Sequence, residues 1–190
     1  MASLKDNFNE LVERIKHGRD LEHASYEPIY YLVFHPSQIL EAKRQLPAWK
    51  SRLEREGWDV HVFSIAEHVL EILRSAPQRK IWLAADRKAP LAWEKTNQAL
   101  ANALSQGALQ ERLNQTLTEL SAKRNALLLV TDLEALHPYM RIGAVESQLY
   151  GKFSVPTVFL YPGERTGKTR LKFLGFYPED GNYRSVHVGG

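Results

Sequence analysis

The first part of the chain alternates two patterns of apolar residues, one with the period of a helix and one typical of a strand. Between Leu4 and His17, apolar residues recur every three or four positions, which predicts an amphipathic helix. Residues 29–34 are apolar without interruption and rich in tyrosine, valine and isoleucine. This composition is expected of a strand covered on both faces, because a strand with one wet face would alternate.

A second strand and two helices follow the first strand. Pro36 cannot donate a backbone hydrogen bond, so the strand should end there, and Ser37 is expected to cap a helix over residues 38–56. Residues 59–65 alternate toward a second strand, and residues 66–75 favour another helix. Strands separated by a single helix need a crossover connection, and this favours a parallel sheet.

The middle of the chain is helical. Residues 77–123 are rich in Ala, Leu, Gln and Glu, with leucines at near-helical intervals, and predict two or three helices. Residues 126–131 are again uniformly apolar and predict a third strand at the centre of the sheet. A further helix is expected over residues 143–150.

The C-terminal part predicts a change of strand direction. Residues 155–161 and 171–176 have strand patterns, and the loop of residues 162–170 is too short for a crossover, so we expect an antiparallel hairpin. The tail, residues 180–188, is expected to add a short edge strand. The fold class is therefore α/β, with a mainly parallel sheet flanked by helices and a C-terminal antiparallel hairpin. Because 190 residues suit one hydrophobic core, a single domain over residues 1–190 is expected.

Composition narrows the class of protein. With 44% hydrophobic and 25% charged residues the chain should fold, and its lack of cysteine excludes disulfides, thiolate zinc sites and a cysteine nucleophile. The N-terminal segment interleaves charged and apolar residues, so we expect neither a signal peptide nor membrane contact, and a cytoplasmic location. The four tryptophans are expected to be core or interface anchors: Trp49, Trp58, Trp82 and Trp93.

Two features of the sequence could indicate binding of nucleic acid or of a nucleotide, and each is weak support for such a function. The net charge is only +3, and the densest basic stretch, residues 165–172, is interpreted as a solvated hairpin, with a phosphate or acidic-partner contact as the alternative. Residues 163–169 resemble a phosphate-binding P-loop. Only three residues separate Gly163 from Gly167 where a P-loop has four, and a strand pattern follows where a helix should begin.

Polar residues gather where the predicted parallel strands end. His35 follows the first strand, and residues 131–141 follow the third, at the sheet edge where α/β proteins place ligands. Within the second segment Asp132, His137, Tyr139 and Arg141 supply carboxylate, imidazole, phenol and guanidinium groups. Asp132 also suits a helix cap or turn, and His137-Pro138 suits a turn, so a structural role stays open beside a binding role.

Known catalytic patterns do not appear. The seven histidines lack HxxxH or HExxH spacing, no GxSxG elbow presents a serine, and the first strand is not followed by a glycine-rich dinucleotide fingerprint. We therefore expect no catalytic residue, no cofactor and no metal.

The order of several segments resembles the BrxB family of BREX (bacteriophage exclusion) defence systems. The resemblance is carried by residues 128–141 (LLVTDLEALHPYMR), 155–163 (VPTVFLYPG), 171–176 (LKFLGF) and 182–184 (NYR), and it spans about Asn7 to Val188. The family pattern usually doubles the tyrosine before the last arginine, whereas this chain has Asn182-Tyr183-Arg184.

This resemblance implies membership of a bacterial operon that restricts phage, together with a DNA methyltransferase, an alkaline-phosphatase-like PglZ protein and a large ATPase. We expect a non-catalytic scaffold or adaptor that binds another BREX protein, the PglZ-like protein first, with DNA contacted only weakly or indirectly and a homo-oligomer allowed. The alternatives are a degenerate P-loop-like nucleotide-binding module and a DNA-binding accessory subunit. The expected partner-binding residues, which should converge at one end of the sheet, are Asp132, His137, Tyr139, Arg141, Asn182, Tyr183 and Arg184.

Overall fold

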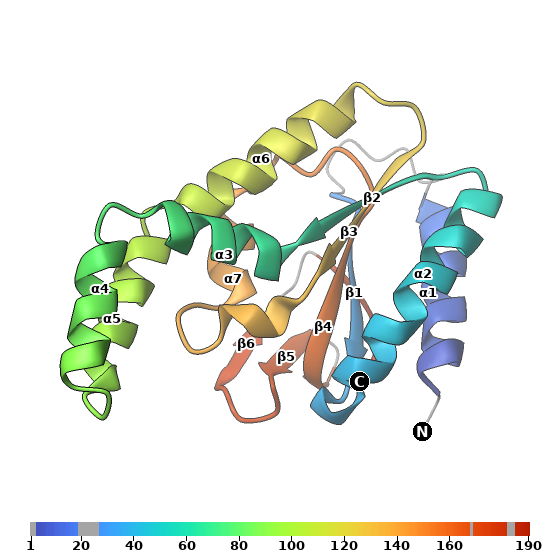
Figure 1. The fold of residues 1–190 in the computed structure, drawn as a ribbon. Helices are drawn as coiled ribbons and strands as arrows, with labels where there is room; N and C mark the ends of the chain where they lie inside the picture. Colours follow the sequence, from blue (N-terminus) through green and yellow to red (C-terminus); the bar gives the residue numbers. More distant parts are fainter. Residues whose placement is uncertain (1–2, 19–26, 168, 182–184) are drawn as a thin grey trace.

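A mainly parallel β-sheet lies between two layers of helices in the computed structural model, which describes residues 3–18, 27–167, 169–181 and 185–190 (Figure 1). The strands of the main sheet run in the order β2-β3-β4-β1-β7 and every neighbouring pair is parallel. The predicted α/β class is therefore confirmed. The strands are β1 (Ile29–Phe34), β2 (Asp59–Ser64), β3 (Ala126–Thr131), β4 (Thr157–Thr166), β5 (Arg170–Phe173), β6 (Glu179–Gly181) and β7 (Val186–Gly189).

Burial of each strand follows its place in the sheet. All six residues of β1 and of β3 are buried, as their uninterrupted apolar sequences predicted. In β1 the side chains alternate between the two faces: Tyr31 packs into one core cluster and Leu32 into the other. Strand β2 is at one edge of the sheet, and its burial does not follow the alternation of its sequence: Val60 and Phe63 are buried in opposite core clusters, whereas Val62 is 43% exposed. The predicted tail strand is also confirmed, since β7 pairs with β1 at the opposite edge.

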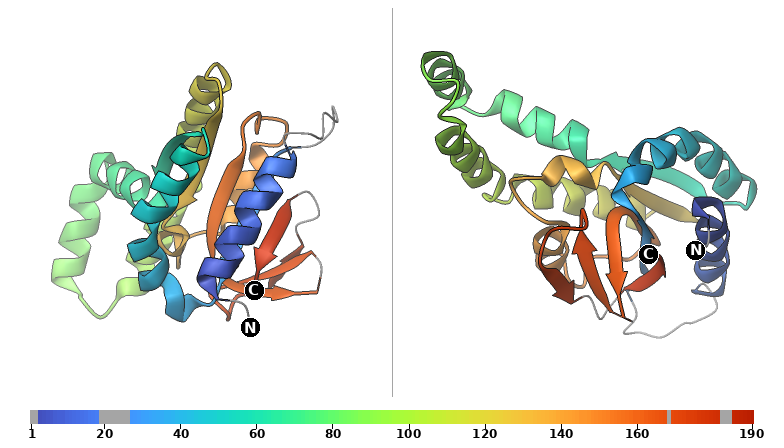
Figure 2. Two further views of the ribbon diagram at one scale, coloured as in Figure 1. Left: turned by 90° about the vertical axis from the view of Figure 1, so that its right-hand side faces the viewer. Right: turned by 90° about the horizontal axis from the view of Figure 1, so that it is seen from below.

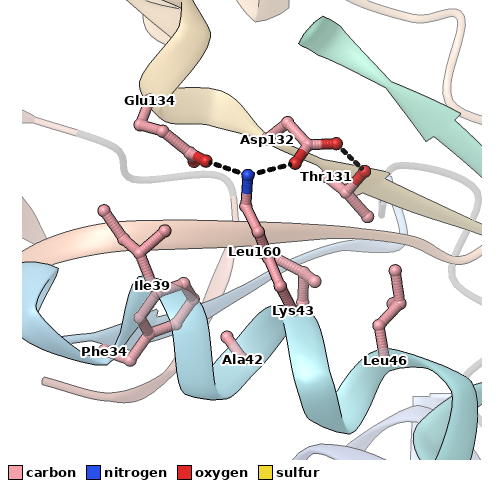
Figure 3. A pocket seen from close by; sticks show the side chains of 9 residues that line it. All are labelled: Phe34, Ile39, Ala42, Lys43, Leu46, Thr131, Asp132, Glu134 and Leu160. Atoms are coloured by element: carbon pink, nitrogen blue, oxygen red, sulfur yellow. Dashed lines mark hydrogen bonds and ion pairs between the residues drawn. The ribbon is translucent and has the colours of Figure 1, made fainter. Parts of the chain in front are cut away.

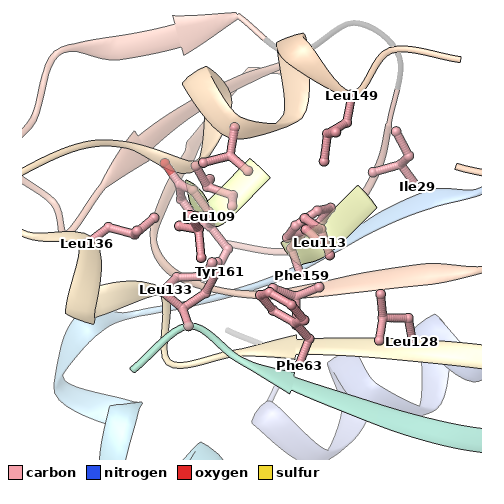
Figure 4. Packing of buried hydrophobic residues seen from close by; sticks show 14 of the residues in the cluster. Ile29, Phe63, Leu109, Leu113, Leu128, Leu133, Leu136, Leu149, Phe159 and Tyr161 are labelled. Carbon is pink, nitrogen blue, oxygen red and sulfur yellow. The ribbon is translucent and has the colours of Figure 1, made fainter. Parts of the chain in front are cut away.

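Helices cover both faces of the sheet (Figure 2). One cluster of buried residues joins α1 and α2 to the sheet, and the other joins α3, α6 and α7 to its opposite face, around Phe63, Leu113 and Phe159 (Figure 4). The helices are α1 (Leu4–Gly18), α2 (Ile39–Arg55), α3 (Ile65–Ser75), α4 (Arg79–Lys88), α5 (Trp93–Leu104), α6 (Ala108–Ser121) and α7 (Ile142–Gln148), with 3₁₀ turns η1 (Pro36–Gln38) and η2 (Leu133–Leu136). Three helices therefore fill residues 77–123, in agreement with the prediction.

Two predicted boundaries were wrong for local reasons. Ser37 does not cap the second helix. His35 caps η1 instead: its side chain accepts a hydrogen bond from the Ser37 backbone, and α2 begins only at Ile39. Strand β2 stops at Ser64 because the hydroxyl of Ser64 accepts a hydrogen bond from the Glu67 backbone N–H and so caps α3.

The C-terminal hairpin is tighter than expected. Strand β4 does not end at Tyr161: its first part pairs with β1 up to Pro162, and residues 163–166 then pair antiparallel with β5. Gly163 makes this possible, because a Cβ atom there would lie 2.4 Å from the backbone oxygen of Lys172. The predicted nine-residue loop was therefore wrong in length, although the antiparallel direction is confirmed.

The tryptophans divide between core and surface. Trp49 and Trp58 are buried, and the Trp49 ring stacks on Phe8 with a centroid distance of 4.7 Å. Trp93 is 58% exposed and lies outside the core. Of the two roles expected for the tryptophans, core or interface anchor, the core role is excluded for Trp93, because α4 and α5 extend beyond the sheet (Figure 1), and the interface role stays a prediction.

Candidate partner-binding site at the carboxyl edge of the sheet

The polar residues that follow β3 fall into two groups. Asp132 comes directly after the strand in a left-handed backbone conformation, with φ at 60°. Aspartate tolerates this conformation better than most residues, and the bend turns the chain into η2. His137 and Arg141 follow at the far end of η2 and at the start of α7. The two groups have different partners.

Asp132 belongs to a cluster centred on Lys43 of α2 (Figure 3). The Nζ atom of Lys43 lies 2.8 Å from Oδ1 of Asp132 and 2.7 Å from Oε1 of Glu134. The other carboxylate oxygen of Asp132 accepts hydrogen bonds from the hydroxyls of Ser64, at 2.7 Å, and Thr131, at 2.8 Å. The cluster thus ties α2, β2, β3 and η2 together.

The charges of this cluster stabilise one another. Burial by itself would raise the pKa of Asp132, but the hydrogen bonds from Lys43, Ser64 and Thr131 outweigh burial and lower the pKa below its ordinary value. Burial likewise works against the charge on Lys43, and its bonds to Asp132 and Glu134 more than compensate, so the pKa of Lys43 is raised. Both side chains are therefore ionised at neutral pH and engaged with each other.

The cavity beside this cluster is small and mostly apolar. Its volume is about 30 Å³, and its lining includes Phe34, Ile39, Leu46 and Leu160 (Figure 3). Sites for small molecules or nucleotides usually measure roughly 300–1,000 Å³, so this cavity suits one water molecule. Lys43 and Asp132 therefore form a structural clamp, with no room for a substrate between them.

The second group joins the loop after η2 to the C-terminal segment. The ring nitrogen Nδ1 of His137 and the hydroxyl of Tyr177 share a hydrogen bond of 2.6 Å. Arg141 forms an ion pair of 2.9 Å with Asp180, and its guanidinium lies 6.0 Å from the centre of the Tyr177 ring. Phe176 stacks on Tyr177 and is 62% exposed. We call these five residues, His137, Arg141, Phe176, Tyr177 and Asp180, the edge patch.

The phenols in and behind the edge patch keep their protons. Burial raises the pKa of Tyr177, against a smaller opposing effect of Arg141. Tyr161, at the end of the parallel part of β4, is buried, and burial together with the nearby Asp180 carboxylate raises its pKa far above the ordinary value. Neither tyrosine is therefore activated as a base or nucleophile at neutral pH.

The structure thus separates residues that the sequence grouped. It brings His137 and Arg141 together through the C-terminal segment and places Asp132 in the clamp. Tyr139 is half-buried and packs against the core. The expected residues Asn182, Tyr183 and Arg184 lie outside the described residues, so their convergence with residues 131–141 stays a prediction.

Several residues of both groups were missed by the sequence analysis. Phe176 and Tyr177 follow a glycine and precede a proline, and an aromatic pair in such a turn was an available signal. Lys43 and Ser64 gave no signal, because their closeness to Asp132 depends on the order of the strands.

The P-loop-like segment is a β-hairpin. Gly163 belongs to β4, and β5 begins at Arg170 where a P-loop would open a helix. The arginines of this hairpin already have protein partners: Arg165 donates to the backbone oxygens of Gly167 and His187, and Arg170 pairs with Glu179. The interpretation of this basic stretch as a hairpin is confirmed, and its geometry does not favour phosphate binding.

A metal site and a membrane-spanning helix are both absent from the described residues. Within the described residues, no three or more His, Asp or Glu side chains are grouped so as to hold a metal ion. In that same part of the chain, no helix combines the length and the apolar character needed to cross a membrane.

Comparison with known proteins identifies the family of the chain. No curated protein and no solved structure matches the chain at a significant level. A family model described as BREX protein BrxB matches residues 61–188, which is more than half of the 190-residue chain. The match includes both segments of the edge patch and begins later than Asn7, where the resemblance in the sequence begins. The chain therefore belongs to the BrxB family and is a component of a BREX phage-defence system.

Proposed function

We propose that this BREX component is a non-catalytic scaffold or adaptor, and that its edge patch docks another BREX protein, the PglZ-like protein in the first place. The observation that carries the proposal is the exposed ring of Phe176, which packs against the rings of His137 and Tyr177 at the edge of the sheet. Open α/β sheets bind their ligands at this edge.

The composition of the edge patch suits a protein partner. Aromatic residues and arginine dominate the energetics of protein interfaces, because aromatic rings bury large areas at a small cost in side-chain freedom and the guanidinium forms charge-assisted hydrogen bonds. Phe176 rests on Tyr177 with 4.7 Å between ring centres, so its orientation is set before a partner arrives. Such preorganisation lowers the entropic cost of binding.

The chemistry of the site supports docking over catalysis. Asp132 and Lys43 are engaged with each other, and the pKa values of Tyr161 and Tyr177 are shifted away from neutrality. A general base or nucleophile would instead need a pKa near the working pH and room for a substrate. The described polar groups at this edge are arranged as structural pairs.

Co-purification tests the proposal. Tagged protein should retain the PglZ-like protein at moderate salt, and Phe176→Ser should weaken this binding about tenfold or more, because a desolvated aromatic anchor is lost. Arg141→Ala should weaken it as well and reduce phage protection. Leu70→Ser is the matched control: Leu70 is also an exposed large apolar residue, but it lies on α3.

Two results would contradict the docking role of the edge patch. One is a wild-type chain that retains no BREX protein. The other is Phe176→Ser protein that is folded, by its far-UV spectrum and unfolding temperature, yet binds and protects like wild type. Turnover of a nucleotide or phosphodiester that is lost when one polar residue of the edge patch is replaced would show an enzyme instead.

A further inference from the structure

Helices α4 and α5 form a hairpin that extends away from the sheet (Figure 2). We call residues 79–104, which comprise α4, α5 and their connection, the arm. Helix α4 contains no buried residue, and in α5 only Leu104, at the base of the arm, is buried. The arm therefore contributes little to the hydrophobic core.

The two helices of the arm are held together by their own contacts. Trp82 is half-buried and lines a shallow pocket with Ala99 and Ala103 of α5. The hydroxyl of Thr96 donates a hydrogen bond of 2.8 Å to Asp86. The arm thus keeps its shape without being covered by the rest of the described chain.

Large apolar side chains remain on its surface. Leu91, in the connection at the tip, is 93% exposed, Ile81 is 69% exposed, and Leu83 and Trp93 also face solvent. Single exposed apolar residues are common on protein surfaces. Four within one short projection are a concentration that marks a contact surface, because folding gains nothing from them.

The positions of these residues favour a partner with a groove over a partner with a flat surface. Successive residues of a helix are turned by about 100°. Because Trp82 points toward α5, its neighbours Ile81 and Leu83 lie on opposite flanks of α4. A flat lipid surface could contact only one flank, whereas the walls of a groove contact both.

Charge identifies the kind of groove. The arm carries five basic and two acidic residues, a net charge of +3, and all seven are exposed. Two copies of the arm would therefore repel each other, and the whole chain also has a net charge of +3. Nucleic acid would match the charge, but its surface is mostly phosphate and sugar and offers little apolar area to Leu91 and Ile81. A protein surface that combines acidic and apolar residues matches both the positive charge and the apolar side chains of the arm.

We propose that the arm inserts into an apolar groove with an acidic rim on another protein of the BREX system. This inference rests on the proposed scaffold function and adds a second docking surface, distinct from the edge patch. A chain with two such surfaces can hold two partners at once. The residues that carry the contact are Ile81, Leu83, Leu91 and Trp93, with Arg87 and Lys88 beside the tip.

The test measures binding of the full chain to each purified BREX protein in turn. Leu91→Asp should weaken binding of one of them about tenfold or more. The double variant Arg87→Glu, Lys88→Glu should slow its association, and added salt should weaken wild-type binding. The controls are Leu40→Asp, at a leucine that is 65% exposed on α2, and Arg44→Glu, at an exposed arginine of the same helix. Both should bind like wild type.

The outcomes separate this inference from the proposed function. The arm is confirmed as a second surface if the partner lost by Leu91→Asp is retained by Phe176→Ser. If binding depends on Phe176 and is unchanged in Leu91→Asp, the arm inference fails and the edge patch stands. If the wild-type chain binds no BREX protein, both fail.

Two further measurements exclude other occupants of the arm. Sedimentation with phosphatidylserine vesicles tests a lipid surface, and analytical ultracentrifugation of the chain alone tests a second copy. Vesicle binding or dimerisation that Leu91→Asp abolishes would overturn the proposal of an acidic protein groove.

Discussion

The clamp between Lys43 and Asp132 makes a quantitative prediction for Asp132→Asn. Asparagine keeps the size of the side chain and tolerates the left-handed backbone at φ 60°. The substitution removes the negative charge that faces Lys43 and turns two charge-assisted hydrogen bonds into neutral ones. Its effect therefore isolates the electrostatics of the clamp.

The magnitude follows from exposure and from the number of bonds. The Lys43 side chain is 47% exposed, so its ion pair with Asp132 contributes at most about 1 kcal/mol. Weakening the bonds from Ser64 and Thr131 costs about 0.5 kcal/mol each. The free energy of unfolding should therefore fall by up to about 2 kcal/mol. In a chain of this length, such a loss lowers the unfolding temperature by about 4–8 °C.

The dependence on pH provides a second check. The pKa of Asp132 is lowered in the folded protein, so its carboxylate stabilises the fold above the unfolded value and this stabilisation is lost as pH falls through the folded value. The difference between wild type and Asp132→Asn should be complete above about pH 5 and shrink toward pH 3. Urea unfolding at several pH values measures it. Lys43→Met should cost about 1 kcal/mol, since Asp132 keeps its two hydroxyl donors.

The opposite result would refute the clamp. If Asp132→Asn were as stable as wild type at pH 7 but lost phage protection, Asp132 would be a partner-binding residue, as the sequence predicts. A stability difference that did not change between pH 7 and pH 3 would show that the charge of Asp132 is not responsible.

Three further predictions concern other parts of the fold. Trp49→Ala should lower the free energy of unfolding by about 3–5 kcal/mol, whereas Trp93→Ala should change it by less than about 0.5 kcal/mol. Equal effects of the two substitutions in thermal unfolding would contradict the assignment of Trp49 to the core and Trp93 to the surface. Gly163→Ala should destabilise the chain by about 1–3 kcal/mol, because the new Cβ atom would lie 2.4 Å from the backbone oxygen of Lys172. Gly143→Ala in α7 is the control: its new Cβ atom would have no neighbour within 4 Å, so the substitution should be neutral or slightly stabilising. Burial, with a smaller effect of Arg165, lowers the pKa of His187 to about 4, so the unfolded chain binds more protons than the folded chain below pH 6.5. The free energy of unfolding should therefore decrease as the pH is lowered from 6.5 to 4, by up to about 1.4 kcal/mol per pH unit. If urea unfolding shows the same dependence on pH in His187→Gln, His187 is not its source.

Much of the architecture can be predicted from the sequence, because helix and strand periods are local properties. The uninterrupted apolar runs of β1 and β3 identify buried strands, and the single-helix spacing of β1 and β2 indicates a parallel sheet. The sequence also identifies β2 as a strand, but its alternation does not predict which residues are buried, because Val62 is exposed at the edge of the sheet. Boundaries are less certain where a side chain caps a helix, as Ser64 does for α3.

What the sequence by itself determined about this protein is therefore the set of elements, the fold class and the absence of familiar catalytic motifs. The tertiary structure alone decided which polar residues meet. Lys43 and Ser64 reach Asp132 because α2 packs on one face of the sheet and β2 pairs with β3, and Arg141 finds Asp180 because β4 continues into the hairpin. These contacts join residues far apart in the chain, so their geometry follows from strand order and helix packing, which no local pattern of residues encodes.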